Sequence, residues 1–243
     1  MGSHHLVGGA RVARKPDHRS RHAIPKGAGE RALNRQRLKR AKKAGRDTKR
    51  MDIRKARASD AAHLARFINM AADDLPLHFW RKTVGPDGDS WALGQERAAR
   101  ETGNFSYHNA WLAEVDGAVA ACLLGYAAED QPGPIDPDAP PIFVPLLELE
   151  ALVPGSWYLN VLATYEAFRG KGLGSALLAY AEVIAAAAGH DTISLIAEDT
   201  HQDALRLYTA KGYRQVARRP VVKDDWDVDA SEWILFTKPV GIT

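Results

Sequence analysis

The stretch from Tyr158 to Ser175 carries the residue types best suited to binding an anion. It reads Tyr-Leu-Asn-Val-Leu-Ala-Thr-Tyr-Glu-Ala-Phe-Arg-Gly-Lys-Gly-Leu-Gly-Ser, a strand-like run that leads through a glycine-rich turn into an apolar helix. Glycines at 170, 172 and 174 let backbone N–H groups approach a ligand closely. The helix start adds unpaired N–H groups and a positive dipole end. With the charges of Arg169 and Lys171, these groups predict a pyrophosphate site.

The spacing of these glycines excludes two common phosphate loops. A P-loop needs four residues between its glycines, followed by Gly-Lys-Ser/Thr, and this pattern is absent. The dinucleotide fingerprint Gly-x-Gly-x-x-Gly is also absent, because Gly170-Lys-Gly-Leu-Gly174 is spaced more tightly. Taken alone, the loop is equally consistent with a strand-to-helix turn that binds no ligand.

Two segments together resemble one enzyme superfamily. Arg169-Gly-Lys-Gly-Leu-Gly174 resembles the Arg/Gln-x-x-Gly-x-Gly/Ala loop of GNAT acyltransferases. Ala204-Leu-Arg-Leu-Tyr208-Thr-Ala-Lys-Gly212-Tyr213 is similar to the Ala-x-x-x-Tyr-x-x-x-Gly-Phe/Tyr segment that follows the fifth strand there. In element order the resemblance spans residues 53–238, and it is greatest to uncharacterised bacterial members with a Pro-rich insertion. It implies an α/β (α+β) GNAT-type fold with a mixed, mostly antiparallel central sheet flanked by helices.

The resemblance also implies acetyl-CoA as co-substrate and assigns its contacts. Backbone groups of Leu162, Ala163 and Thr164 would pair with the pantetheine arm as if it were an added strand. The pyrophosphate would be held by the loop residues Arg169, Gly170, Lys171, Gly172, Leu173, Gly174 and Ser175. Where the family often has an Asn that bonds the pantetheine, this chain has His201. Its imidazole can keep that contact, help to deprotonate the acceptor, or have only a structural role at the start of the helix.

The resemblance places Tyr208 where the family has a hydroxyl close to the acyl-CoA sulfur. The implied role is a general acid that protonates the leaving thiolate, and the alternative is a buried aromatic on the apolar face of its helix. Candidates for the general base are carboxylates at the end of the fifth strand and in the insertion: Glu198, Asp199, Glu148 and Glu150. These can equally be solvated or capping groups, because orienting the two reactants can supply much of the catalysis. A backbone N–H of residues 162–164 would stabilise the oxyanion.

Residues 51–243 are predicted to form one acetyltransferase domain with a Pro-rich insertion at 127–156, a length typical of lids and binding loops. Asp116-Gly117 predicts a hairpin turn, Ser59 and Thr200 are the expected N-caps, and residues 74–83 are expected to be irregular. Strands are predicted at 53–56, 109–114, 119–126, 158–163, 192–197, 213–222 and 232–238, and helices at 60–71, 91–102, 146–152, 175–188 and 202–211.

Charge divides the chain sharply. Residues 1–50 hold 16 Lys/Arg and 3 Asp/Glu, whereas the remainder holds 17 and 27, a net charge of −10. The basic segment has almost no large apolar side chains and is predicted to be disordered, with a basic helix at 30–44. It is either an arm that contacts RNA or another polyanion, or a solvated tail upstream of a start at Met51.

The acceptor side is expected from residues 74–83, the insertion and residues 223–231, which combine aromatics with carboxylates. Their charge fits a cationic small-molecule or peptide amine, although a solvated acidic surface would look the same. We see no zinc-ligand spacing among the nine His and one Cys, so no metal is expected.

Composition bounds the remaining possibilities. The sequence contains no run of about 18 apolar residues, so no membrane span is predicted. No signal-peptide core is evident. The single cysteine, Cys122, fits a reducing compartment. A cytoplasmic monomer or homodimer is therefore expected. Two rival functions remain open, a non-catalytic acyl-CoA-binding module and an RNA-binding protein with an incidental glycine turn.

Overall fold

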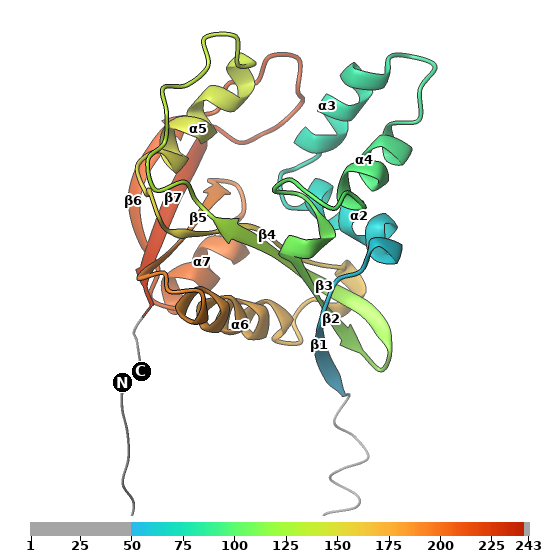
Figure 1. Cartoon of the computed structure of the whole chain (residues 1–243), viewed down its shortest axis with the longest axis vertical. Coiled ribbons are helices and arrows are strands. Elements are labelled where there is room, and N and C mark those ends of the chain that lie inside the picture. The colour runs from blue at the N-terminus through green and yellow to red at the C-terminus, as the bar shows by residue number, and fades with distance from the viewer. Residues whose placement is uncertain (1–49, 241–243) are drawn as a thin grey trace, which may run out of the picture. The chain divides into compact units, whose positions relative to one another are not determined.

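A computed structural model describes residues 50–240, and the predicted basic arm with its helix at 30–44 lies outside the described residues. The strands are β1 (Met51–Lys55), β2 (Ala110–Val115), β3 (Ala118–Ala127), β4 (Trp157–Thr164), β5 (Thr192–Glu198), β6 (Arg214–Pro220) and β7 (Glu232–Pro239). They form one sheet in the order β1-β2-β3-β4-β5-β7-β6 (Figure 1). Only β4 and β5 pair in parallel, which confirms the predicted mixed, mostly antiparallel sheet.

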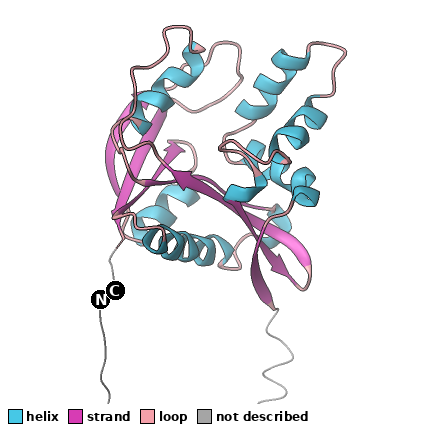
Figure 2. Cartoon of the chain, in the orientation of Figure 1, coloured by secondary structure: helices cyan, strands magenta, loops and turns pink. Residues whose placement is uncertain are grey.

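Helices cover both faces of the sheet (Figures 1 and 2). One face carries α2 (Ala61–Met70), α3 (Leu75–Val84), α4 (Ser90–Ala98) and, from the insertion, α5 (Val144–Glu150), whereas the other carries α6 (Leu173–Ala187) and α7 (Gln202–Ala210). Between residues 50 and 240, no helix combines the length and the apolar composition that a membrane-spanning segment needs.

Alternation along the strands builds the two layers of the core. Ala121 and Leu123 pack with α6, while the intervening Cys122 and Leu124 pack with α2 on the opposite face. Cys122 is fully buried, and this burial raises the pKa of its thiol far above the usual range. It is therefore the packed core thiol that its neighbours predict, not a nucleophile.

The segment at 74–83 is helical, so the expectation of an irregular loop was wrong. Pro76 stands in the first turn of α3, where its missing N–H leaves no hydrogen bond broken. Leu77 and Trp80 bury their side chains against the core. Proline and aromatics suggested a loop, but the helix is stabilised by tertiary packing of its apolar face.

Both predicted N-caps were also wrong, and so was one helix end. Ser59 lies inside a short 3-10 turn, Ala58–Asp60, and α2 begins after Asp60. Before α7 the capping position belongs to His201, not Thr200, and its side chain makes no capping bond. The helix predicted to reach residue 102 ends as α4 at Ala98. The Asp116-Gly117 hairpin is confirmed, with φ of 54° and 81° at the two residues.

A bulge in β4 shapes the centre of the sheet. Leu159 pairs with Gly125 and Val161 with Leu124, which leaves Asn160 as the extra residue of a β-bulge. The parallel pairing between β4 and β5 covers only Trp157–Leu159. Beyond the bulge, β4 pairs with β3 alone among the described strands. The β5-facing backbone of residues 162–164 is therefore left without a strand partner.

We predict that Gly125→Ala destabilises the protein, because a Cβ there would lie 2.2 Å from the ring of Trp157 at the start of β4. Such overpacking of a core costs about 1–3 kcal/mol. Urea unfolding of the full chain measures it, with Gly133→Ala as a control because a Cβ at Gly133 meets no neighbour. Equal midpoints for the two variants would show that the Trp157 contact does not constrain β4.

Candidate active site

A cavity of about 750 Å³ lies where β4 and β5 separate. Its wall combines the end of β4, the glycine loop, the end of β5 and the start of α7. The structure brings most of the predicted cofactor residues to this wall: Leu162, Ala163, Thr164, Arg169, Gly170, Gly172, Leu173, Gly174 and His201. Tyr208 lines the same cavity, whereas Lys171, Ser175, Glu198 and Asp199 do not.

The glycine loop has the backbone conformation that glycine permits. Gly170 and Gly172 have φ of 71° and 80°, in the left-handed region that other residues rarely adopt. A Cβ at either position would meet no atom, so conformation rather than crowding requires glycine. Gly172 is also the N-cap of α6, so the first N–H groups of that helix are free of intrahelical bonds. Such a helix start, here at the wall of the cavity, is suited to binding an anion.

The two basic side chains of the loop differ in placement. Arg169 donates from Nε to the carbonyl of Thr164 at 3.4 Å and lines the cavity. Lys171 donates to the carbonyl of Ala167 at 2.6 Å and lies over the ring of Phe168, outside the cavity wall. Arg169 is therefore the loop's cation for a ligand in the cavity.

These features fit an acyl-CoA. The unpartnered edge of β4 suits an amide-bearing pantetheine arm, and the loop with Arg169 suits a pyrophosphate. A family model described as the acetyltransferase (GNAT) family matches residues 72–213, more than half of the chain. The chain belongs to the GNAT acetyltransferase family. It is thus an acyltransferase. A search of curated protein sequences finds no match to it.

Solved GNAT-type structures share the fold at low identity. An acetyltransferase crystal structure is 24% identical with a TM-score of 0.57, covering 78% of this chain and 100% of its own. The polyamine N-acetyltransferase of Drosophila melanogaster is 16% identical with a TM-score of 0.54, covering 78% and 100%. YncA of Salmonella typhimurium, a putative acetyltransferase solved with acetyl-CoA, is 18% identical with a TM-score of 0.50, covering 79% and 95%. These similarities establish the fold.

Tyr208 belongs to both the core and the cavity of this GNAT domain. Its side chain is only 7% exposed, and its ring packs near Tyr213 and Phe236 at centroid distances of 6.0 and 5.9 Å. Burial raises the pKa of Tyr208 to about 12. Its hydroxyl is therefore protonated at neutral pH, the state that a proton donor needs.

The two carboxylates at the end of β5 have different surroundings. Asp199 accepts from the N–H of Ser231 at 3.0 Å, and its own N–H donates to Glu232, so it ties β5 to the start of β7. Glu198 is fully buried, and neither of its carboxylate oxygens has a hydrogen-bond partner among residues 50–240. Burial and then the Asp73 carboxylate raise the pKa of Glu198 to about 9. At neutral pH it is a buried neutral acid.

One contact at the site has no counterpart in the sequence pattern. His201 Nε2 lies 3.1 Å from Asp73 Oδ1 and 3.8 Å from Glu198 Oε2. Asp73 comes from the turn between α2 and α3, far away along the chain. Its φ of 36° and that of Asp74, 67°, are both left-handed, which is uncommon for two successive non-glycine residues. No local spacing could have predicted this pairing.

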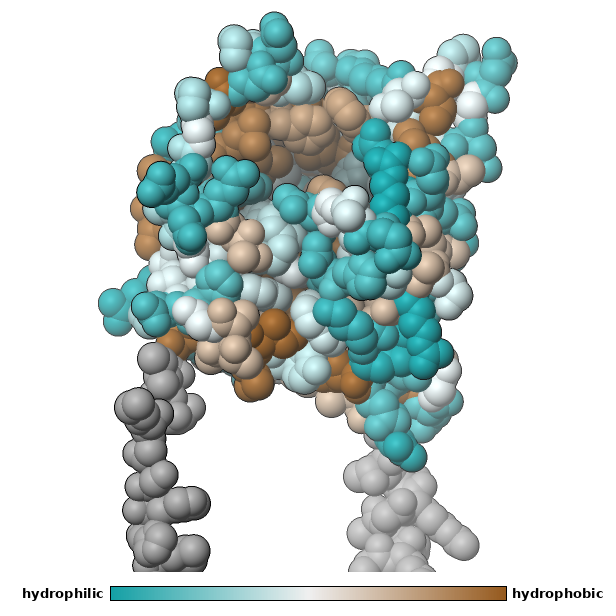
Figure 3. All heavy atoms as spheres, in the orientation of Figure 1, coloured by the Kyte–Doolittle hydropathy of each residue, from teal (hydrophilic) through white to brown (hydrophobic). Residues whose placement is uncertain are grey.

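The three segments expected on the acceptor side do meet. Phe79 of α3 lies edge-on to Phe143 before α5, at 5.0 Å between centroids. Trp226 of the β6–β7 loop stacks on Trp233 in the same apolar cluster. Figure 3 shows apolar side chains gathered in a hollow on this face, between α5 and α3. An acceptor can approach β4 from here, on the face opposite α6.

Part of the predicted acidic surface is neutralised internally. Lys82 pairs with both Asp224 and Asp225, and His78 lies 3.0 Å from Asp225. These contacts fasten the β6–β7 loop to α3. The acidic loop therefore contributes less free negative charge than its sequence suggests.

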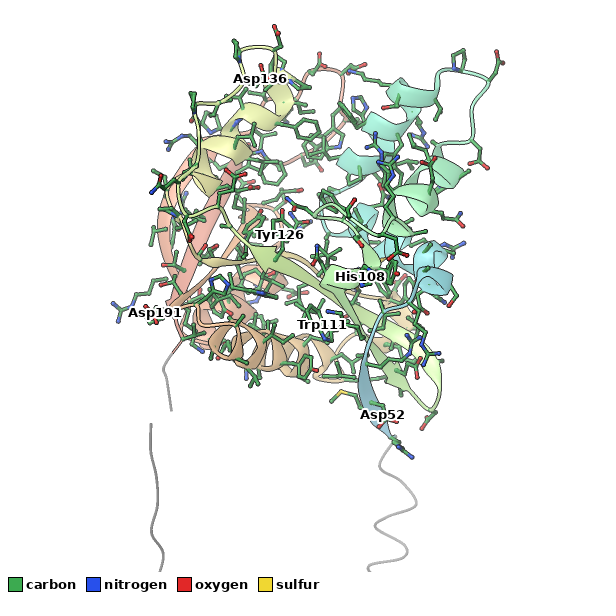
Figure 4. The ribbon with its side chains drawn as sticks, viewed as in Figure 1. Asp52, His108, Trp111, Tyr126, Asp136 and Asp191 are labelled. Atoms are coloured by element: carbon green, nitrogen blue, oxygen red, sulfur yellow. The ribbon has the colours of Figure 1, made fainter. Side chains whose placement is uncertain are left out.

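The two carboxylates of α5, Glu148 and Glu150, have different surroundings. Glu148 is ion-paired with Arg219. Burial raises the pKa of Glu150 to about 7, while a hydrogen bond with Tyr158 opposes the rise. Next to Tyr158, the Tyr126 hydroxyl accepts from Asn160 of the cavity wall at 3.4 Å, and Figure 4 shows Tyr126 beside β4. Glu150 is thus a partly buried carboxylate next to Tyr158 of β4.

We predict that Glu198→Gln becomes increasingly stabilising as pH rises. Glu198 binds its proton in the folded state up to about pH 9 but releases it near 4.5 when unfolded. Wild-type stability therefore falls with pH across this window, by about 1.4 kcal/mol per unit. From pH 6 to pH 8 the difference amounts to about 2.8 kcal/mol, so the melting temperature of the variant should gain roughly 6–11 °C on wild type.

Thermal unfolding of the full chain at each pH tests this prediction, with the exposed Glu129→Gln as the matched control. The control should follow wild type at every pH. A Glu198→Gln variant that follows it as well would mean that Glu198 ionises normally in the folded protein.

Proposed function

We propose that this enzyme transfers an acetyl group from acetyl-CoA directly to a primary amine within a ternary complex. The observation that carries the proposal is one cavity bounded by the unpartnered β4 edge, the glycine loop and Tyr208. A donor thioester and a protonated hydroxyl then share one space. The apolar hollow near α3 and α5 gives the amine a separate approach (Figure 3).

Each part of the site has one task in this reaction. Backbone groups of residues 162–164 hold the pantetheine arm, and one N–H stabilises the oxyanion. The loop from Arg169 to Ser175 holds the pyrophosphate. The amine nitrogen bonds to the carbonyl carbon, the carbon–sulfur bond breaks, and the thiolate takes a proton from Tyr208. Overall an ammonium and an acetyl thioester give an acetamide, a thiol and one released proton.

A cationic acceptor is the class that the charge and shape support best. Residues 51–243 have a net charge of −10, which attracts polyamines or lysine-bearing peptides. The polyamine acetyltransferase of the same fold accepts small cationic amines according to its name. Spermidine and agmatine are therefore the first acceptors to test.

We predict that acetyl-CoA stabilises the full chain and that Arg169→Glu removes the effect. A ligand at 100 times its Kd stabilises by about 2.7 kcal/mol, or roughly 5–10 °C for a domain of this size. The control is Arg214→Glu, the same charge change at an exposed position of the edge strand β6. An unchanged melting temperature in wild type at millimolar acetyl-CoA would contradict the donor site.

We predict that Tyr208→Phe lowers kcat about 100-fold, the usual scale for losing a general acid, and leaves the acetyl-CoA thermal shift intact. Release of free thiol with spermidine or agmatine measures the rate. A variant with wild-type kcat would assign Tyr208 to the core alone. Donor binding without turnover of any amine would instead favour a non-catalytic acyl-CoA-binding module.

A further inference from the structure

A polar cluster of His201, Asp73 and Glu198 joins the cavity to the turn between α2 and α3. His201 lines the cavity wall. It stands at the N-cap of α7, yet its side chain makes no capping hydrogen bond. Its Nε2 turns instead to Asp73 at 3.1 Å and Glu198 at 3.8 Å. The imidazole is therefore fixed on one side by carboxyl groups and borders the cavity on the other.

We propose that His201 is the catalytic base that takes the proton from the acceptor's ammonium group, and that Asp73 and Glu198 are positioning residues that orient its ring. This inference rests on the proposed function and identifies the base that the proposed reaction leaves unassigned.

The contact with Asp73 selects one tautomer of the ring. A carboxylate accepts a hydrogen bond, so Nε2 carries the hydrogen and donates it to Asp73 Oδ1. The lone pair then lies on Nδ1, which no helix-capping bond occupies. A neutral imidazole held this way can accept a proton from an amine in the cavity, directly or through one water.

The turn that carries Asp73 is secured from several sides. The carbonyl of Asp73 accepts from Trp226 Nε1 at 2.9 Å. The carboxylate of Asp74 accepts from the amide of Asn69, and that amide's oxygen accepts from the N–H of Leu77 at 2.9 Å. Two successive left-handed residues persist only where their surroundings fix them. Here the fixed turn directs a carboxylate at His201.

Glu198 gives a second, independent reason to assign a function to this cluster. Its side chain is fully buried, and both of its oxygens lack hydrogen-bond partners among residues 50–240. Buried polar groups are nearly always hydrogen-bonded, so an exception calls for an explanation. Its carboxyl lies beside the Asp73–His201 pair, 3.8 Å from His201 Nε2, where it helps to hold the ring in place.

The charges around the imidazole are compatible with this role. Asp73 approaches from the α2–α3 turn and Glu198 from β5, while Asp199 is engaged by the N–H of Ser231. On α7, Asp203 and Arg206 form their own ion pair. Within residues 50–240, neither Asp73 nor Glu198 is ion-paired with a lysine or arginine. The carboxylate of Asp73 is thus available to orient the imidazole, because no lysine or arginine among these residues competes for it.

The protons balance over one cycle. The ammonium gives one proton to Nδ1 of His201 and becomes the nucleophilic amine. After attack the nitrogen loses a second proton, which replaces the one that Tyr208 gives to the thiolate. The imidazolium then returns its proton to water, so the enzyme ends each turnover in its starting state.

The test compares kcat and KM of the full chain for spermidine between pH 6 and 9.5. We expect His201→Gln to lower kcat about 100-fold and to remove the acidic limb of the profile. Asp73→Asn should lower kcat, because the ring loses the carboxylate contact that fixes its tautomer and orientation. Glu198→Gln should lower kcat with little change in KM. The control Asp87→Asn, in the exposed α3–α4 loop, should match wild type.

Two readouts do not depend on turnover. The acetyl-CoA thermal shift should persist in Asp73→Asn and Glu198→Gln, which lie outside the cavity wall, and this would show that both variants fold and bind the donor. Nitrogen NMR of the imidazole in the free enzyme should show the Nε2–H tautomer of His201 in wild type and in Asp87→Asn, and a mixture of tautomers in Asp73→Asn. An unchanged tautomer in Asp73→Asn would overturn the positioning role of Asp73.

Other outcomes separate this inference from the proposed function. If wild type binds acetyl-CoA but acetylates neither spermidine, agmatine nor a lysine peptide, the proposed function fails. If wild type is active and His201→Gln keeps its kcat and acidic limb, only the base assignment fails, and Glu150 becomes the candidate. If activity requires added Zn²⁺ that Asp73→Asn no longer binds, the cluster is a metal site and the base assignment is overturned.

Discussion

The separation of β4 from β5 is the constraint on which the rest of the site depends. Their parallel pairing ends at Leu159, although β5 continues along β7 and β4 continues along β3. The bulge at Asn160 occurs at this point and bends β4 away. A strand edge inside a protein carries polar groups that need partners. In the complex that we propose, an acyl-CoA arm would supply such partners and complete a sheet edge that the chain alone leaves open.

Topology then brings the chemical groups to the same opening. The chain leaves β4 through the glycine loop into α6, and it leaves β5 through His201 into α7. Both helix starts therefore lie beside the gap, one with free N–H groups and the other with an imidazole. Tyr208 follows on α7, close enough to share the cavity. The groups that we propose for phosphate binding and for proton transfer lie together because the two strands that precede these helices are neighbours.

The sequence predicts what depends on local pattern. Alternating apolar runs, the Asp116-Gly117 turn and the spacing of Gly170, Gly172 and Gly174 each determine a nearby backbone, and the structure has these elements where they were expected. The helix α3 was missed because its apolar face becomes stable only against the core. The Asp73–His201 contact could not be predicted either. It joins two distant segments through a left-handed turn whose partners, such as Trp226, lie elsewhere in the chain.

The structural features that lower the stability of this fold lie close to one imidazole, that of His201. Burying Glu198 costs stability at neutral pH because its carboxyl must stay protonated, and an apolar side chain there would avoid this cost. The left-handed Asp73 and Asp74 add a further backbone cost. Neither cost is needed to form the sheet or to close the core. Asp73 and Glu198 both contact His201 at the wall of the cavity. Features that weaken a fold at one shared point are best explained by what that point does, and the role we propose for it is the transfer of a proton.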